Sequence, residues 1–269
     1  MPRFILYQER CKQCGICSQA CPAKIIKGGE GETPTPRAGF EDRCIACGHC
    51  TAFCPHRACD IDALPADQYR PVDRKLLPSV EAVNMLCKAR RSTRFYKTDP
   101  VPRETAAAVL DTVRYAPSAK NQQALRFVSL DRESLNRLCD LMADRLEQPE
   151  TAALIAEAKG LAAAWRRGMD LIFRGAPHAI FVIGPKGDHW SGVDAVIAAT
   201  YLELAALPHG IGCCWAGYAS ILVQGDRDME ALLGLREGEA VHAVQMFGFI
   251  RLKPTGIPAR KVLDCTWID

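Results

Sequence analysis

The spacing of hydrophobic residues predicts mainly helices from about residue 79 onward. Val80, Val83 and the pair Leu86–Cys87 recur at helical intervals behind Ser79, a residue type that commonly caps the start of a helix. Similar patterns predict helices at 102–113, 131–147, 151–173 (with interruptions near Gly160 and Gly168) and 226–233. Residues 192–207 are apolar almost all round, which predicts a central buried helix.

Strands are predicted where apolar residues run on without a helical gap. Residues 178–184 (HAIFVIG) and 239–250 predict two buried strands, and 127–130 predicts a shorter one. Alternating residues in the tail, ARKVLDCTWID (259–269), suggest that it could extend a sheet. About six helices around a few strands predict an α+β domain, and not a regularly alternating βαβ fold.

The N-terminal quarter follows a different pattern. Residues 4–7 (FILY) predict one short strand, and the segment 28–40 is a loop rich in Gly, Pro and Thr. A proline-rich stretch of mixed charge follows Ile61. We therefore predict a small domain at 1–63, a linker at 64–78 and a larger domain at 79–269.

Charge and hydropathy argue against a nucleic-acid or membrane partner, a membrane span and a signal peptide. The formal net charge is only +3, which gives no reason to expect binding to nucleic acid or to an anionic membrane. No apolar run reaches the ~18 residues of a membrane span. The apolar stretch within MPRFILYQER is too short to predict a signal peptide.

Two cysteine-rich segments form an internal repeat. CKQCGICSQACP begins at Cys11 and CIACGHCTAFCP begins at Cys44, and both read C-x-x-C-G-x-C-x-x-x-C-P. This pattern resembles that of bacterial two-[4Fe–4S] ferredoxins, in which the fourth cysteine of each run ligates the other cluster. The predicted ligand sets are therefore Cys11, Cys14, Cys17 and Cys54 for one cluster, and Cys44, Cys47, Cys50 and Cys21 for the other. Zinc knuckles are the alternative, although zinc favours two C-x-x-C pairs separated by a long spacer.

The eight repeat cysteines are part of a total of fourteen. A disulfide framework would suit a short secreted chain, which a 269-residue chain is not. Thiolate-held clusters need a reducing compartment, so we expect a cytoplasmic protein.

Three separated pieces of the larger domain share a chemical theme. Arg90, Arg91, Ser92 and Arg94 form one basic cluster, Asn121 and Gln123 follow a Pro-Ser break, and Arg260 and Lys261 lie near the C-terminus. Guanidinium groups and a hydroxyl suit a phosphate, and carboxamides suit the polar edge of a heterocycle. Each piece also has an ordinary interpretation. The arginine cluster can be a solvated basic turn, the segment with Asn121 and Gln123 a loop, and Arg260 with Lys261 a surface pair.

Taken together and in this order, RRSTRF, APSAKNQQ, GIGCCWAG and GFIRLKP…ARK resemble the FMN-dependent nitroreductase family. The resemblance implies an α+β domain with a central, mainly antiparallel sheet flanked by helices, and an intertwined homodimer with FMN at its interface. It places Arg90, Arg91, Ser92 and Arg94 at the FMN phosphate, ribityl chain and pyrimidine side, and Pro117, Ser118, Asn121 and Gln123 along the ring. It also places the backbone amides of Ala216 and Gly217 at flavin N5 and O4, and Arg260 and Lys261 at the phosphate.

Two departures from the family pattern lie near the substrate face. The family usually reads N-x-Q-P-W where this chain has Asn121-Gln122-Gln123-Ala124-Leu125, and Ala216 stands where an acidic residue is common. The sequence therefore leaves the identity of the substrate more open than the binding of FMN. No side-chain acid is identified as catalytic, because FMN N5 itself carries out the hydride transfer that the resemblance implies.

The expected function joins the two domains. Two clusters fused to a flavin domain predict electron flow from a low-potential donor, a ferredoxin or flavodoxin, to FMN and then to a nitroaromatic, quinone or similar small electrophile. Three alternatives stay open: an NAD(P)H-dependent nitroreductase with accessory clusters, an iron–sulfur flavoprotein that only carries electrons, and a flavin-storing or flavin-modifying protein.

Overall fold

The computed structural model describes residues 1–64 and 69–268. Residues 65–68 of the predicted linker, and residue 269 at the end of the predicted larger domain, lie outside the described residues. The chain divides into two compact units. The first unit comprises Met1–Leu77 and Ala119–Gln122, and the second comprises Pro78–Ser118 and Gln123–Asp269. The short segment Ala119–Gln122, which the sequence placed in the larger domain, thus groups with the first unit.

The first unit is built from very short elements. Strand β1 (Phe4–Leu6) pairs antiparallel with β4 (Cys59–Ile61), and β2 (Ile26–Lys27) pairs with β3 (Thr35–Pro36). The helices are α1 (Ile16–Ala20), α2 (Phe40–Arg43) and α3 (His49–Ala52), and η2 (Arg74–Leu76) is a 3₁₀ turn. The strand predicted at residues 4–7 is confirmed, and it ends at Leu6. A small core of cysteines and apolar side chains, Phe40 and Ile25 among them, holds these pieces together.

The second unit contains a four-stranded sheet in the order β5-β6-β8-β7. The strands are β5 (Arg126–Leu130), β6 (His178–Pro185), β7 (Ile211–Trp215) and β8 (Glu239–Phe249), and all three pairings are antiparallel. The predicted α+β class with an antiparallel sheet is confirmed. The predicted apolar runs are β5, β6 and β8.

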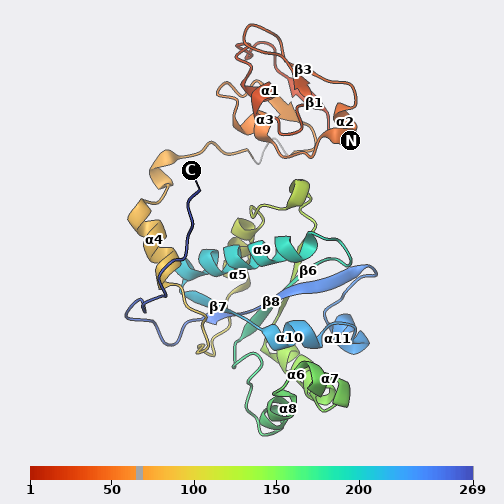
Figure 1. Ribbon diagram of the computed structural model, residues 1–269, viewed down its shortest axis with the longest axis vertical. Helices are drawn as coiled ribbons and strands as arrows, with labels where there is room; N and C mark the ends of the chain where they lie inside the picture. The colour runs from red at the N-terminus through yellow and green to blue at the C-terminus, as the bar shows by residue number, and fades with distance from the viewer. Residues whose placement is uncertain (65–68, 269) are drawn as a thin grey trace. The chain divides into compact units, whose positions relative to one another are not determined.

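Helices cover both faces of this sheet (Figure 1). Helices α5 (Arg103–Val113) and α9 (Ser191–Ala206) pack on one face, where Val109 and Leu202 meet Ile180 and Phe247. The other face carries α6 (Arg132–Leu146), α7 (Pro149–Leu154), α8 (Ala158–Arg166), α10 (Gly217–Leu222) and α11 (Arg227–Leu232). Because β6 is covered on both sides, its side chains are apolar without alternation.

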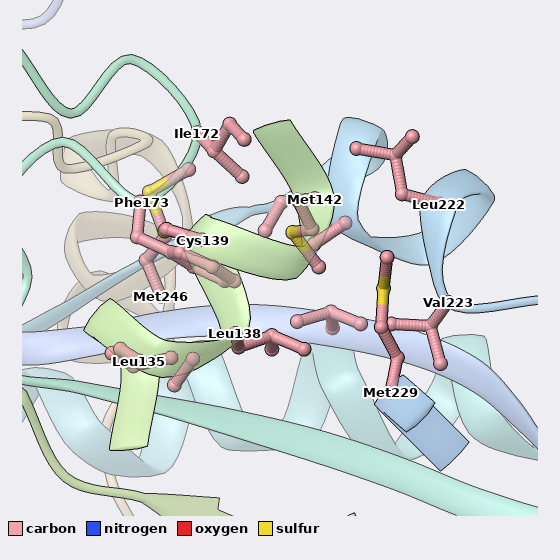
Figure 2. Close-up of a cluster of buried hydrophobic side chains, with 14 of the residues drawn as sticks. Leu135, Leu138, Cys139, Met142, Ile172, Phe173, Leu222, Val223, Met229 and Met246 are labelled. Atoms are coloured by element: carbon pink, nitrogen blue, oxygen red, sulfur yellow. The ribbon is translucent and has the colours of Figure 1, made fainter. Parts of the chain in front are cut away.

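The larger core lies beneath α6. Leu135, Leu138, Cys139 and Met142 of this helix are fully buried, and Met229 packs in the same cluster (Figure 2). Burial of apolar side chains contributes ~1.5–3 kcal/mol for each large residue, so this layer supplies much of the unit's stability.

Side chains cap the starts of two helices, and the cap at Ser79 was predicted. The Ser79 hydroxyl accepts a hydrogen bond from the Ala82 amide at the start of α4 (Val80–Ala89). The Asp131 carboxylate accepts one from the Ser134 amide at 2.8 Å at the start of α6. Each cap satisfies an amide that has no partner within its own helix.

Three details differ from the sequence prediction. The segment 151–173 is not one helix broken at Gly160; α7 and α8 are separated at residues 155–157, and Gly160 lies inside α8. Helix α9 is not buried all round, since Val193 and Val196 are exposed. The described part of the tail, up to residue 268, forms no strand, and its residues are exposed. None of the described helices is both long and apolar enough to cross a bilayer.

Candidate functional site

Two cavities in the first unit gather the repeat cysteines in the predicted crossed arrangement. Four of the repeat cysteines line the first cavity: Cys11, Cys14, Cys17 and Cys54. The other four line the second cavity: Cys21, Cys44, Cys47 and Cys50. Each cavity therefore takes three cysteines from one repeat and the fourth from the other. The donor sets fit two cubane clusters, and the ligand role of each cysteine stays a prediction.

The thiol arrangement also bears on the zinc alternative. Among the described residues, no three His, Cys, Asp or Glu side chains converge on a point as ligands of one metal ion do. A structural zinc site needs four donors ~2.0–2.3 Å from one ion. A cubane takes one thiolate at each of four separate irons, so its ligands surround a larger volume.

The backbone repeats along with the sequence. Gly15 and Gly48 occupy the same repeat position, and both begin a short helix with a left-handed φ, of 67° and 70°. Two further equivalent pairs of non-glycine residues also have positive φ: Gln13 with Ala46, and Lys24 with Arg57. Such conformations cost about 1–3 kcal/mol each and persist where the surroundings require them. The chain thus bends in the same way around each cavity.

A ninth cysteine of the first unit, Cys59, was not assigned by the sequence. It is 2% exposed, lies in β4, and donates a hydrogen bond to the Cys50 carbonyl at 3.2 Å. Hydrogen bonds from Cys59 lower the pKa of Cys17 to about 6 and that of Cys50 to about 7. The pKa of Cys59 itself is raised by the same contacts. This favours thiolates at Cys17 and Cys50, the form that binds metal. The sequence offered one signal for this role, namely that Cys59 follows Cys54, the last cysteine of the repeats, by five positions.

The second unit has a cavity of about 300 Å³ at the end of β7. It brings together three residues of the predicted flavin set, Arg94, Ala216 and Gly217. The Ala216 amide donates to the Val244 carbonyl at 2.9 Å, so in this conformation it is not free for a ligand. Gly217 is the first residue of α10, where an amide has no partner within the helix.

Arg94 reaches this cavity because its segment lies against the edge of the sheet. The Thr93 amide donates to the Cys213 carbonyl at 2.9 Å, and Tyr96 forms a β-bridge with Ile250. Gly212 permits this approach, since a Cβ there would lie 2.0 Å from the Thr93 hydroxyl oxygen. The glycine that the sequence showed only as part of GIGCCW therefore positions the basic segment.

A second cation, Arg174, lines the same cavity and was missed by the sequence analysis. It lies in the loop before β6 with a left-handed φ of 55°. Isolated from other basic residues in FRGAP, it gave no pattern to detect. Two guanidinium groups make the cavity suitable for an anion such as a phosphate. The adjacent Cys214 thiol has a raised pKa, mainly through burial, and so stays protonated.

Other members of the predicted flavin set lie elsewhere. Pro117, Ser118 and Gln123 line a different cavity of about 120 Å³, together with Asp194. Within it, the backbone amide of Gln123 donates to the Ser118 hydroxyl at 3.1 Å. One copy of the chain thus does not bring this group and the Arg94 group into a single cavity.

The first arginine of the basic segment has a protein partner. Arg90 forms an ion pair with the buried Glu203 at 2.8 Å, and Glu203 also accepts a hydrogen bond from Gln245 at 3.0 Å. Arg91 donates to the Lys88 carbonyl at 2.6 Å. These contacts fix the segment to α9 and to the sheet.

The remaining predicted residues do not line the cavity of Arg94. Asn121, in η3 (Ala119–Asn121), belongs to the first unit and donates to the carbonyls of Ile45 and Ala46, each at 3.1 Å. Arg260 and Lys261 are exposed in the tail and do not line that cavity. Their predicted contacts with FMN stay predictions.

Comparisons with known proteins agree with this division of the chain. The model of the nitroreductase family matches residues 87–249, and that of a 4Fe-4S dicluster domain matches residues 10–59. A nitroreductase with bound FMN from Bacteroides fragilis aligns with TM-score 0.57 and 23% identity over 68% of this chain and 98% of its own. An FMN-bound nitroreductase from Desulfitobacterium hafniense gives 0.56 and 23% over 69% and 97%.

A third solved structure, the FMN-dependent nitroreductase NfnB from Mycobacterium smegmatis in complex with NADPH, aligns with TM-score 0.53 and 23% identity over 70% of this chain and 98% of its own. At these identities the likeness establishes the fold. The family model covers more than half of the chain. The predicted fusion is confirmed: the chain belongs to the nitroreductase family and carries a 4Fe-4S dicluster domain ahead of the family domain.

Proposed function

We propose that the protein is a ferredoxin-coupled flavin oxidoreductase. Electrons from a low-potential donor, a ferredoxin or flavodoxin, enter through two [4Fe–4S] clusters and pass to FMN and then to a small electrophile such as a nitroaromatic or a quinone. The observation that carries this proposal is the pair of cavities, each lined by a crossed set of four cysteines, in a chain whose other unit is a nitroreductase domain.

The cysteines hold and insulate the clusters in this proposal. Cys17, Cys21 and Cys50 are buried, and apolar side chains such as Ile25 and Phe40 line the second cavity with Cys21 and Cys50. Solvent exposure and hydrogen bonding set the potential of such clusters. Every repeat cysteine is used as a ligand, so the first unit has no vacant iron ligand for a substrate and acts in electron transfer.

The second unit binds and orients the flavin. Bound FMN supplies hydride transfer at N5. Arg94 and Arg174 provide positive charge for its phosphate or for the pyrimidine side of the ring, and the Gly217 amide at the start of α10 provides a hydrogen-bond donor. The Ala216 amide could join only if its hydrogen bond to Val244 opened.

A second copy of the chain would complete the flavin site. Pro117 and Ser118 lie in a different cavity from Arg94, as expected if each copy contributes one side of a shared site. Apolar side chains that one copy leaves exposed support this interpretation: Val80 and Met85 of α4 are 73% and 59% exposed, and Trp267 in the tail is 85% exposed. Exposed apolar surface of this extent marks an interaction site. We therefore propose a homodimer.

Donor-driven reduction of the flavin tests this function. In anaerobic stopped-flow experiments, reduced ferredoxin is mixed with the wild-type protein, with Cys14→Ala and with the control Cys87→Ala, whose thiol is exposed and outside the repeats. Wild type and the control should show rapid bleaching of the flavin, and Cys14→Ala should show little. Donor-driven turnover that survives the loss of the cluster would contradict the proposal.

The same instrument separates the alternatives. Rapid reduction by NADH or NADPH, with no response to reduced ferredoxin, would favour an NAD(P)H-dependent nitroreductase with accessory clusters. Reduction by ferredoxin without turnover of any nitroaromatic or quinone would favour an electron carrier.

A further inference from the structure

The Asp170 carboxylate holds the loop that precedes β6 at several points. Its Oδ1 atom accepts hydrogen bonds from the backbone amides of Ile172 and Phe173, at 3.1 and 2.7 Å. Its Oδ2 atom accepts from the Gly175 amide at 3.0 Å and from the Arg132 guanidinium at 2.7 Å. The side chain is only 8% exposed, so water competes little for these hydrogen bonds. Both oxygens of one buried carboxylate thus fix the backbone of this loop.

Arg174 lies between two of the amides that Asp170 binds. Phe173 precedes it and Gly175 follows it, and the φ angles of Arg174 and Gly175 are both left-handed, at 55° and 70°. A non-glycine residue is uncommon in this region and stays there where the surrounding structure requires it. One hydrogen bond to Asp170 on each side of Arg174 supplies that requirement. The carboxylate therefore sets the backbone conformation from which the Arg174 side chain starts.

The loop is anchored in the core, whereas the Arg174 side chain is not. Phe173 is fully buried, and Arg132 of α6 also donates to the Ala176 carbonyl at 3.3 Å, which ties the end of the loop to that helix. Arg174 is exposed instead, and it lines the cavity that Arg94 also lines. A loop with a fixed base thus presents a cation to this cavity.

Asp170 can affect a ligand in the cavity only through Arg174. It is not among the described residues that line the cavity, and Arg132 pairs with its charge. The described lining includes the guanidinium groups of Arg94 and Arg174 and no acidic side chain. An arginine whose backbone is already ordered loses less conformational freedom when it binds an anion, so the anion is bound more tightly. Loss of the Asp170 hydrogen bonds should therefore weaken anion binding without removing a contact to the anion.

We propose that Asp170 is a positioning residue of the flavin site, which fixes the backbone around Arg174 so that this guanidinium meets an anionic group of FMN. Asp170 keeps its hydrogen bonds throughout, and no covalent bond is made or broken at this residue. The inference rests on the binding of FMN in the cavity of Arg94, which belongs to the proposed function, but not on the clusters or the electron donor. A carboxylate that only stabilised the fold would have the same effect with and without the Arg174 side chain.

Retention of FMN by the full-length holoprotein tests this inference in a double-mutant cycle. The variants are Asp170→Asn, which replaces one acceptor oxygen by a donor, Arg174→Ala, and the two combined. Asp226→Asn is the matched control, because Asp226 likewise accepts a backbone amide, that of Met229 at 3.0 Å, and pairs with an arginine, Arg145, but does not line the cavity. Each sample is diluted, and the fluorescence of the released FMN gives the dissociation constant. Urea denaturation of the same samples gives their stability.

We expect Asp170→Asn to raise the dissociation constant of FMN roughly fivefold, and Asp226→Asn to leave it unchanged. In the Arg174→Ala background, Asp170→Asn should change the dissociation constant by less than about twofold. Equal effects of Asp170→Asn in both backgrounds would show that it acts on the fold alone, and would overturn the inference. An unchanged dissociation constant in Asp170→Asn itself would also overturn it.

If Asp170→Asn does not fold, Asp170→Glu takes its place in the cycle, and the same outcomes decide. The longer side chain keeps the negative charge beside Arg132 but moves the oxygens by one methylene relative to the loop amides. Failure of the proposed flavin site would appear differently, as an unchanged dissociation constant in Arg174→Ala, and the inference would fall with it. Failure of donor-driven reduction would leave these FMN affinities as they are.

Discussion

The two units achieve a folded state in different ways. The strands of the first unit are two or three residues long and its helices four or five, around a core in which cysteines make up much of the buried surface. The second unit has an 11-residue strand, β8, and a 16-residue helix, α9, and a sheet covered on both faces. Segments as short as those of the first unit bury too little apolar surface to be stable alone, so bound clusters would have to supply the missing free energy.

Among the changes considered, removal of iron should affect the two units most differently. We expect the first unit to lose its fold when the clusters are stripped by a chelator, because its three-residue β1–β4 ladder and its small cysteine-rich core bury little apolar surface. The second unit should keep its fold, since its core contains no predicted ligand. Hydrogen–deuterium exchange with peptide resolution measures both units in one sample.

The informative peptides are those covering 4–61 and those covering α6 and β6. Full exchange in the first group with persistent protection in the second is the expected outcome. Protection of the first group in the iron-free protein would show that this unit folds on its own, and the contrast between the units would fail.

The two units also differ in how far the sequence reveals them. All eight predicted ligands lie in two repeats, so the resemblance of their spacing to that of two-[4Fe–4S] ferredoxins predicted which cysteines share a cavity. In the second unit the cavity is assembled from Arg94, Arg174 and Gly217, which lie far apart along the chain and approach only through the sheet. Arg174 has no basic neighbour, and Arg90 has a buried partner, Glu203, more than one hundred positions away. Neither the role of Arg174 nor the Arg90–Glu203 pair produces a local pattern in the sequence.

Gly212→Ala should produce the next largest effect, and it is confined to the second unit. The added Cβ would lie 2.6 Å from the Thr93 Cβ and 2.9 Å from a side-chain carbon of Ile250, so backbone must move. We expect a loss of about 3 kcal/mol in the free energy of unfolding of the second unit, the upper range for overpacking. Urea denaturation measures it, and the displaced Arg94 should also lower the FMN content.

Gly160→Ala is the matched control, because a Cβ at that position of α8 meets no atom within 4 Å. It should leave stability unchanged or raise it by about 0.4–1 kcal/mol. Adding Thr93→Gly to Gly212→Ala should restore part of the loss. If Gly212→Ala is as stable as Gly160→Ala, the close approach of the basic segment to β7 is not required.

Arg174→Ala should have a smaller effect, on flavin affinity and not on folding. The side chain is exposed, and it lines the cavity beside Arg94. Loss of one charge-assisted hydrogen bond costs ~1.5–3 kcal/mol, or roughly a tenfold or greater rise in the dissociation constant of FMN. Fluorescence titration of the flavin-free protein measures it, with the exposed Arg167→Ala as control. Equal affinities in the two variants would remove Arg174 from the site.

Asn121→Ala should give the smallest effect, and it decides between two roles for one residue. The family resemblance places Asn121 at the flavin, whereas its amide holds the carbonyls of Ile45 and Ala46, in the loop between Cys44 and Cys47. If the cluster loop is its main partner, the variant should lose about 1 kcal/mol of loop stability. Chelator should then remove iron roughly fivefold faster, with FMN affinity unchanged. The adjacent, exposed Gln122→Ala controls for any change in η3 itself. A fall in FMN affinity with normal cluster lifetime would assign Asn121 to the flavin, and its effect would then belong to the second unit.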